Sequence, residues 1–238
     1  MRTVKPADLL FTQGFGTRRE CAALVANGCL DVEGAGVIDD FERELDVTGD
    51  FWFRVRGGPR WPYRQRALVV MNKPAGYECS QKPRHHASVY SLLPAPLRQR
   101  GVQAIGRLDE DTTGVLLFTD DGTLVHRLTS PKHHVAKVYE VGCKHVVDAG
   151  QIDRLRAGVL LHDDNETVRA AACEATGERA LRLTLVEGKY HQVKRMIAAV
   201  GNRVETLERS AFGPVRVDGL AAGAWRWLDA DREFAAPR

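Results

Sequence analysis

The sequence lacks long apolar runs, paired cysteines and segments of low complexity, and each absence excludes a class of protein. No apolar stretch among its 238 residues approaches the ~20 residues that cross a membrane. The opening segment, MRTVKPADLL, has no hydrophobic stretch of the kind a signal peptide needs. The five cysteines are odd in number and never stand at Cys-x-x-Cys spacing, which argues against a disulfide framework and a zinc ribbon. The sequence therefore predicts a cytoplasmic protein with no membrane partner.

The charged residues are unevenly distributed along the chain, although the net charge is only +3. Residues 31–50 hold eight acidic residues, whereas residues 51–66 hold five arginines and no acid. A segregated arginine cluster suits a partner that carries phosphate, although a solvated surface can have the same composition. The histidine pairs His85-His86 and His133-His134 do not predict a metal site, because adjacent side chains point apart.

The first sixty residues predict a small domain of their own. Thr17 and Glu20 have the spacing of a capping box, and they open a helix that ends at Gly28. The segment CLDVEGAGV then alternates around glycines, which predicts a short hairpin. Arg18 and Arg19 open the helix, where cations oppose the helix dipole, so they are poorly placed for stability alone.

The rest of the chain predicts a larger domain that begins after an arginine- and glycine-rich linker. We place the boundary after residue 60, which gives domains 1–60 and 61–238. The runs ALVVMNK, GVLLFTDD, VAKVYEVGC and ALRLTLVEG predict strands, while QIDRLRAGV and HQVKRMIAAVG have helical spacing. Strands dominate, so the expected class is α+β with a mixed, mainly antiparallel sheet.

The segment GRLDEDTTGVLLFTDDG, residues 106–122, concentrates five carboxylates around one loop. Counted from Asp109, it follows a calcium-binding loop until Leu117 occupies the ninth position and Asp120 replaces the final Glu. Its flanks, VQAIGRL and VLLF, predict strands, whereas a calcium hand needs two helices. The sequence therefore argues against a calcium site.

Paired acid–base carboxylates are the next interpretation of this segment. Asp120, Asp121 and Gly122 predict a turn after the strand, and Glu110 should point away from its neighbour. Asp109 remains, and the residues alone leave open whether it is an ion-pair partner or a catalytic carboxylate.

Four ordered motifs resolve this question by resemblance. GRLDEDTTGVLLFTDDG resembles the central motif of the pseudouridine synthases, and MNKPAGYECS, KVYEV and EGKYHQVKRM resemble three further motifs of that family. Together they span residues 71–196. SPKHHVAKVYEV and GYECS resemble the RsuA-type branch, and residues 6–56 resemble its S4-like RNA-binding domain, from which the acidic segment 31–50 departs.

The resemblance implies an enzyme that isomerises uridine to pseudouridine in small-subunit (16S) rRNA, at the family's uridine 516 position. The expected partner is that rRNA within a partly assembled subunit, and the protein is expected to be a monomer. The reaction breaks the N-glycosidic bond, turns the uracil and rejoins it through C5, with no net redox change or group donor. We therefore expect no cofactor and no metal. Two alternatives stay open: a synthase acting on 23S rRNA, and a non-catalytic assembly factor that binds rRNA.

The resemblance assigns catalysis to Asp109, Tyr139 and Lys194. Asp109 would attack the sugar or remove its 2′ proton, and the sequence leaves both routes open. Tyr139 would stack on the uracil and help to remove the C5 proton, unless it is a core tyrosine facing with Val135 and Val141. Lys194 would pair with Asp109, unless it is a surface lysine. The prediction is one reacting carboxylate and four that turn or solvate the loop.

The resemblance and the surrounding charge also predict contacts with RNA. Arg107 would hold the flipped-out nucleotide or its phosphate, unless it is the structural partner of a carboxylate. The other expected RNA contacts are basic residues of the small domain, of the second motif and of the last motif: Arg18, Arg19, Lys73, Lys189, His191 and Arg195. Among these, Lys73 is expected to shape a turn at the edge of the site.

Overall fold

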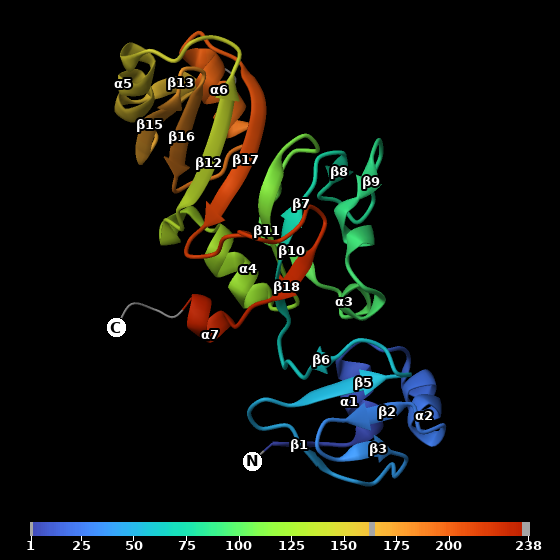
Figure 1. Ribbon diagram of the computed structural model, residues 1–238. Helices are drawn as coiled ribbons and strands as arrows, with labels where there is room; N and C mark the ends of the chain where they lie inside the picture. Colours follow the sequence, from blue (N-terminus) through green and yellow to red (C-terminus); the bar gives the residue numbers. More distant parts are fainter. Residues whose placement is uncertain (1, 162–164, 235–238) are drawn as a thin grey trace. The chain divides into compact units, whose positions relative to one another are not determined.

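The computed structural model describes residues 2–161 and 165–234, which form two compact units (Figure 1). The first unit contains the chain up to Ala67 together with Leu93–Val102, and the second contains Leu68–Leu92 and the chain from Gln103 onward. The division therefore lies later than the boundary expected after residue 60. The added segment belongs to the first unit because Arg100 Nη1 donates a hydrogen bond to Gln13 Oε1 at 2.7 Å.

The first unit combines three short helices with small sheets. Its elements are β1 (Thr3–Val4), α1 (Pro6–Thr12), α2 (Arg18–Ala26), β2 (Leu30–Val32), β3 (Gly36–Ile38), β4 (Leu45–Asp46), β5 (Trp52–Val55), β6 (Trp61–Pro62) and α3 (Ala95–Gln99). Four strands pair in the order β3-β2-β5-β6, and β1 and β4 form a separate two-stranded sheet. The capping box is confirmed: the amide of Glu20 donates to Thr17 Oγ1 at 3.3 Å, and the amide of Thr17 donates to Glu20 Oε2 at 2.7 Å. The expected hairpin is confirmed as β2 and β3.

The second unit contains the remaining elements. They are β7 (Leu68–Lys73), β8 (Tyr77–Glu78), β9 (Ala87–Ser88), η1 (Val89–Leu92), β10 (Gln103–Ala104), β11 (Thr113–Thr119), α4 (Gly122–Thr129), η2 (Pro131–His133), β12 (Lys137–Cys143), α5 (Ala149–Ala157), β13 (Val159–Leu161), β14 (Glu166–Val168), β15 (Ala172–Gly177), β16 (Ala180–Leu185), α6 (Gln192–Ala199), β17 (Val204–Phe212), β18 (Trp225–Trp227) and α7 (Ala230–Glu233). The four strands and two helices expected from the sequence are confirmed.

A long sheet organises the second unit. Its strands follow the order β15-β16-β12-β17-β11-β7-β18, with β10 beside β11 (Figure 1). Only the β11–β17 pair is parallel; every other pair in this sheet is antiparallel. The α+β class with a mixed sheet is therefore confirmed. Because β12, β17 and β11 are neighbours, motifs far apart in the sequence meet in the middle of the sheet.

The centre of the sheet is well packed. Residues 115–118 of β11 are all fully buried, which explains the unbroken apolar run there. Gly114 pairs with Arg209 of β17 and has φ +99°, and a Cβ there would lie 2.3 Å from the carbonyl oxygen of Arg209. Only glycine fits this close approach. The rigid strand then holds the loop that precedes it.

Two expectations around the acidic segment were wrong. The strand expected over VQAIGRL is only β10, and residues 105–109 have no regular structure. The expected Asp-Gly turn is instead the start of α4: the amides of Thr123 and Leu124 donate to Asp121 Oδ1 at 2.9 and 3.3 Å. Asp-Gly fits a helix start as well as a turn, and the buried Leu124 and Leu128 hold this helix in place.

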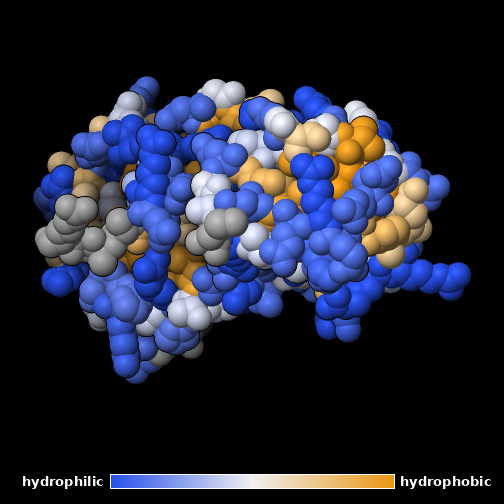
Figure 2. Space-filling model, turned by 90° about the horizontal axis from the view of Figure 1, so that it is seen from below, coloured by the Kyte–Doolittle hydropathy of each residue, from blue (hydrophilic) through white to orange (hydrophobic). Residues whose placement is uncertain are grey.

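Within residues 2–161 and 165–234, every helix is too short or too polar to span a lipid bilayer. The face shown in Figure 2 is mostly hydrophilic, with apolar side chains gathered in separate patches.

Candidate active site

A cavity of about 830 Å³ opens in the second unit. Its lining comes from the loop before β11, the segment after β8, the strands β12 and β17, and the start of α6. Six of the residues expected at the site line it: Arg107, Asp109, Tyr139, Lys189, His191 and Lys194. Residues of all four sequence motifs line this cavity, so the fold brings the motifs together around one space.

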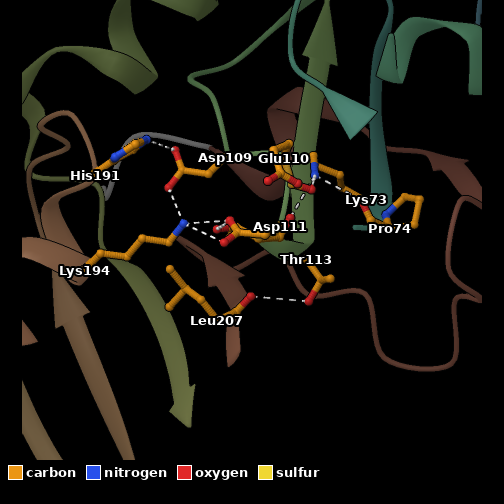
Figure 3. A network of polar contacts seen from close by, with 10 residues as sticks. Lys73, Pro74, Asp109, Glu110, Asp111, Thr113, His191, Lys194 and Leu207 are labelled. Atoms are coloured by element: carbon orange, nitrogen blue, oxygen red, sulfur yellow. Dashed lines mark hydrogen bonds and ion pairs between the residues drawn. The ribbon is translucent and has the colours of Figure 1, made fainter. Parts of the chain in front are cut away.

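The loop that carries Asp109 is held from beneath by Lys73 at the end of β7. The Lys73 side chain is fully buried, and its ammonium donates to the carbonyl oxygens of Pro74, Glu110 and Thr112 at 3.0, 3.1 and 2.9 Å (Figure 3). Burial lowers the pKa of Lys73 from its usual value. This geometry agrees with a turn-shaping role. The expected RNA contact at Lys73 was wrong, because its ammonium is buried and already donates hydrogen bonds to three backbone carbonyl oxygens.

Asp109 lies between two groups from the start of α6. Its Oδ2 is 3.2 Å from Lys194 Nζ, and its Oδ1 is 3.2 Å from His191 Nε2 (Figure 3). About a quarter of the Asp109 side chain remains exposed. The carboxylate is therefore fixed by neighbours and still reachable from the cavity.

Asp111 is the second carboxylate that contacts Lys194, which corrects the expectation that it only solvates the loop. Its two oxygens lie 2.7 and 2.8 Å from Lys194 Nζ, closer than Asp109 does. Burial alone would raise the pKa of Asp111, but the hydrogen bond and charge of Lys194 outweigh it, so that pKa is lowered. Burial would likewise lower the pKa of Lys194, but Asp111 and Asp109 together raise it. Lys194 therefore stays charged between two carboxylates.

The start of α6 explains why a lysine is stable at this position. His191 precedes the helix with φ +46°, a left-handed conformation that turns the chain into it. The amide of Lys189 donates to Gln192 Oε1 at 2.8 Å, which fastens the turn. A cation near a helix N-terminus opposes the helix dipole, but the adjacent Asp109 and Asp111 carry the opposite charge. The predicted compensation is thus shared by two carboxylates.

Tyr139 lies on β12 and reaches the cavity, although only 9% of it is exposed. It stands opposite Leu183 on one side and Arg209 on the other. It is both a packed residue of the sheet and a part of the cavity wall. The two interpretations of the sequence are compatible at this position.

The remaining basic residues differ in their surroundings. Arg107 is exposed on the cavity lining, and among the residues described no carboxylate forms an ion pair with it. Lys189 pairs with Glu166. Arg195 lies outside the cavity lining and donates to the carbonyl oxygen of Tyr190 at 3.2 Å.

Both arginines at the start of α2 are exposed, but they differ in their contacts. Arg18 pairs with Asp8 at 2.7 Å, and its guanidinium carbon lies 4.3 Å from the centre of the Phe11 ring. Arg19 is exposed. Arg18 therefore has an ion pair and a ring contact, and Arg19 is an exposed arginine beside it.

The segment after β8 forms one wall of the cavity and is organised by Glu78. The amides of Arg84, His85 and His86 donate to the Glu78 carboxylate at 3.1, 2.8 and 2.9 Å. These backbone hydrogen bonds, led by the one from His85, lower the pKa of Glu78 to about 2.

We expect Glu78 to titrate far below an ordinary glutamate. Because its folded pKa is depressed, its stabilising contribution is present above the unfolded pKa of about 4.3 and is lost as the pH falls through about 2. An NMR titration of the Glu78 carboxyl carbon should show this low midpoint. Glu78→Gln should speed hydrogen exchange at the amides of His85 and His86; unchanged exchange, or a midpoint near 4.3, would contradict the assignment.

The lining residues that sequence reasoning did not assign to the site include Cys79, Lys137 and Arg209. A signal existed for Lys137, because it stands two positions before Tyr139 and so shares a face of β12. None existed for Arg209, whose burial depends on the pairing of β17 with β12 and β11.

Comparisons with known proteins agree with these motifs. A family model described as RNA pseudouridylate synthase matches residues 67–199. The chain is 41% identical to the ribosomal small subunit pseudouridine synthase A of Yersinia pestis, over 77% of this chain and 78% of that one. It is 40% identical to an uncharacterised RNA pseudouridine synthase of Bacillus subtilis, over 92% of both. A crystal structure of a pseudouridylate synthase matches with a TM-score of 0.67 and 29% identity, over 96% of this chain and 97% of that one.

Proposed function

The chain belongs to the RsuA-type branch of the RNA pseudouridine synthases, and from that premise we propose that its substrate is a uridine in small-subunit ribosomal RNA. The relatives from Yersinia pestis and Escherichia coli, 41% and 42% identical, are named for that subunit. The observation that carries the proposal is the partly exposed Asp109 between Lys194 and His191, in a cavity of about 830 Å³. A single nucleotide turned out of its stack fits a cavity of this size.

Asp109 is the reacting carboxylate in this proposal. It either attacks C1′ of the ribose, so that uracil leaves and an ester forms, or removes the 2′ proton to give a glycal. In both routes uracil is free to turn within the cavity before C5 bonds to C1′. The lysine and histidine contacts hold the carboxylate in place, which favours the reactive geometry over free rotation.

Tyr139 and Lys194 support the same reaction. The ring of Tyr139 forms part of the wall where a flat base would stack, and its hydroxyl would help to remove the C5 proton. Lys194 holds Asp109 in place through their ion pair and balances the charge of Asp111. Arg107 is the exposed cation that we assign to the phosphate beside the flipped nucleotide.

The finer features of the substrate follow from the same branch. We assign the reaction to uridine 516 of 16S rRNA, in a partly assembled subunit in the cytoplasm. The support is the likeness to relatives named for the small subunit.

The first unit is the RNA-binding module in this proposal, and it resembles an S4-like domain in placing a basic helix start beside a short hairpin. We expect the double variant Arg18→Gln/Arg19→Gln to weaken RNA binding and to lower the salt slope of binding by up to about two. Turnover at saturating RNA should not change, because the cavity lies in the other unit. Arg43→Gln, an exposed arginine of the same unit, is the control. Equal affinity in the double variant and wild type would show that α2 does not bind RNA.

The proposed substrate is tested with purified protein and RNA labelled with tritium at C5 of uridine, because bonding of C5 to C1′ releases that hydrogen. We expect release from 16S rRNA or small-subunit particles, and a single modified position on mapping. Release from 23S rRNA alone would favour the large-subunit alternative. Binding without release from either RNA would favour the assembly factor.

A further inference from the structure

Two cationic side chains line the cavity without an acidic partner. Lys137, the first residue of β12, is 8% exposed, and Arg209 on β17 is 2% exposed. In the part of the chain that the structure describes, no carboxylate forms an ion pair with either. Burying a charge without a partner is costly, and two like charges close together raise that cost. Such an arrangement indicates a ligand that supplies the missing negative charge.

Both cationic groups lie close to the aromatic ring of Phe212. Lys137 Nζ lies 5.4 Å and Arg209 Cζ lies 5.3 Å from the centre of that ring. Arg209 Nε donates to the carbonyl oxygen of Val115 at 2.8 Å, which anchors the guanidinium to β11. Its Nη2 is buried and has no hydrogen-bond partner. One donor nitrogen of a fixed guanidinium is therefore buried without an acceptor, in a residue that lines the cavity.

The electrostatics of Lys137 agree with an unfilled anion site. Burial lowers its pKa, the charge of Arg209 lowers it further, and Glu187 opposes both. Glu187 forms no ion pair with Lys137 or Arg209 within the described residues, and its carboxylate accepts a hydrogen bond from Gln192 Nε2 at 2.7 Å. An anion placed between Lys137 and Arg209 would relieve their repulsion.

The surroundings favour a base over a phosphate as that ligand. Leu185, Leu207 and Phe212 are buried and line the same cavity, so the two cations stand among apolar walls. A phosphodiester is strongly hydrated and suits the exposed His85 and His86 at the cavity lining. A flat ring with polar edges suits the buried region beside Tyr139.

We propose that Lys137 and Arg209 bind the carbonyl oxygens of the uracil and stabilise the negative charge that it acquires during the reaction. This inference rests on the proposed function. When the N1–C1′ bond breaks, its electron pair stays with the uracil, and the charge spreads from N1 to O2 and O4. C1′ is meanwhile bonded to Asp109, or becomes part of a glycal whose 2′ proton Asp109 holds.

The rest of the cycle returns that charge without any further reactant. C5 bonds to C1′ and loses its proton, and N1 gains a proton. In the ester route C5 displaces the Asp109 carboxylate from C1′, and in the glycal route Asp109 returns the 2′ proton to C2′, so Asp109 ends as it began. No oxidant, reductant or group donor is consumed. Donors fixed where charge develops act more strongly than donors in water, because they need no rearrangement.

The test is a cycle of protein and substrate changes, read as single-turnover rate and RNA affinity. Lys137→Met keeps an unbranched apolar side chain on Phe212, and Arg209→Lys keeps a charge in the wall. Lys144→Met, an exposed lysine just after β12, is the control. The substrates carry uridine, 2-thiouridine or 4-thiouridine at the target position, because sulfur accepts hydrogen bonds more weakly than oxygen.

We expect Lys137→Met to lower the saturated rate about a hundredfold, with the dissociation constant and melting temperature nearly unchanged. At least one thio-substitution should slow wild type clearly but slow Lys137→Met much less, because the contact is already lost. Arg209→Lys should retain more rate than Lys137→Met.

Three results would overturn the inference: strictly additive effects of side chain and sulfur, rates like those of Lys144→Met, or weaker binding with a salt slope lower by about one, which marks a phosphate contact. If wild type fails to isomerise uridine at all, the proposed function itself is wrong. If wild type is active and only the coupling is absent, this inference alone fails.

Discussion

Asp109→Asn should reduce pseudouridine formation by at least about a thousandfold, which corresponds to ~4 kcal/mol of barrier. The amide has nearly the same shape but is a poor nucleophile and a poor base. Folding and RNA affinity should change little, because the side chain is partly exposed and its contacts are with Lys194 and His191. Single-turnover tritium release and a binding isotherm measure the two effects separately.

Glu110→Gln is the matched control for this prediction. This variant removes the carboxylate of the next residue. The Glu110 side chain is exposed, and its backbone carbonyl oxygen, which accepts a hydrogen bond from Lys73, is unchanged. We expect its rate to stay within about threefold of wild type, as for a surface change away from the reacting groups. Residual turnover of Asp109→Asn within about tenfold of wild type would remove Asp109 from the mechanism.

Lys194→Met should lower turnover by about a hundredfold, as for the loss of one fixed charge at a reacting centre. The structure makes this variant more severe than a single broken pair, because Lys194 separates Asp109 from Asp111. Without it, the pKa of Asp111 should rise, and the acid limb of the rate profile should move to higher pH. Lys194→Arg should be milder, because a guanidinium can still pair with carboxylates.

The pH dependence of stability gives an independent check on Lys194. Its folded pKa is raised, so its contribution to stability is present below the unfolded pKa and is lost as the pH rises through the folded pKa. Asp111 has a lowered pKa, so its contribution is present above its unfolded pKa and is lost as the pH falls. Lys194→Met should therefore lose stability most at neutral pH.

Asp111→Asn is the matched control for the lysine, because it removes the nearer carboxylate and leaves the pair with Asp109. We expect a smaller loss of rate than in Lys194→Met. If Lys194→Met weakens RNA binding and flattens its salt dependence while the saturated rate and acid limb are unchanged, Lys194 is a phosphate contact.

Local sequence signals predicted the elements whose stability is local. The reciprocal hydrogen bonds of Thr17 and Glu20 need only three residues of separation, so the capping box was visible in the sequence. The buried strands β7 and β11 were visible because both faces are covered and the apolar run is continuous. The face of α6 that carries Val193, Met196 and Ile197 was visible from its spacing.

Features that depend on tertiary contacts could not be predicted in this way. Helix α4 was missed because an Asp-Gly pair fits a turn as well as a helix start, and the burial of Leu124 decides between them. The enclosure of Lys73 depends on a loop 37 to 39 residues away returning its carbonyl oxygens. A sequence shows the lysine but not the three acceptors.

The candidate site also contains residues that the sequence predicted and residues that only the tertiary structure shows. Asp109, Tyr139 and Lys194 were named because their motifs resemble a known family, and the fold places them around one cavity. The contact between Asp111 and Lys194 was missed. Two carboxylates that are two residues apart can both face one cation only in a loop of particular shape. Arg209 was missed for a similar reason.

Mapping of pseudouridines across the ribosomal RNA tests the central claim most directly. The measurement compares cells that lack this protein, cells that regain the wild type, and cells that regain Asp109→Asn. We predict that one pseudouridine disappears from the small-subunit RNA, returns with the wild type and stays absent with Asp109→Asn. An unchanged set of pseudouridines, loss of a large-subunit site, or restoration by Asp109→Asn would contradict the account.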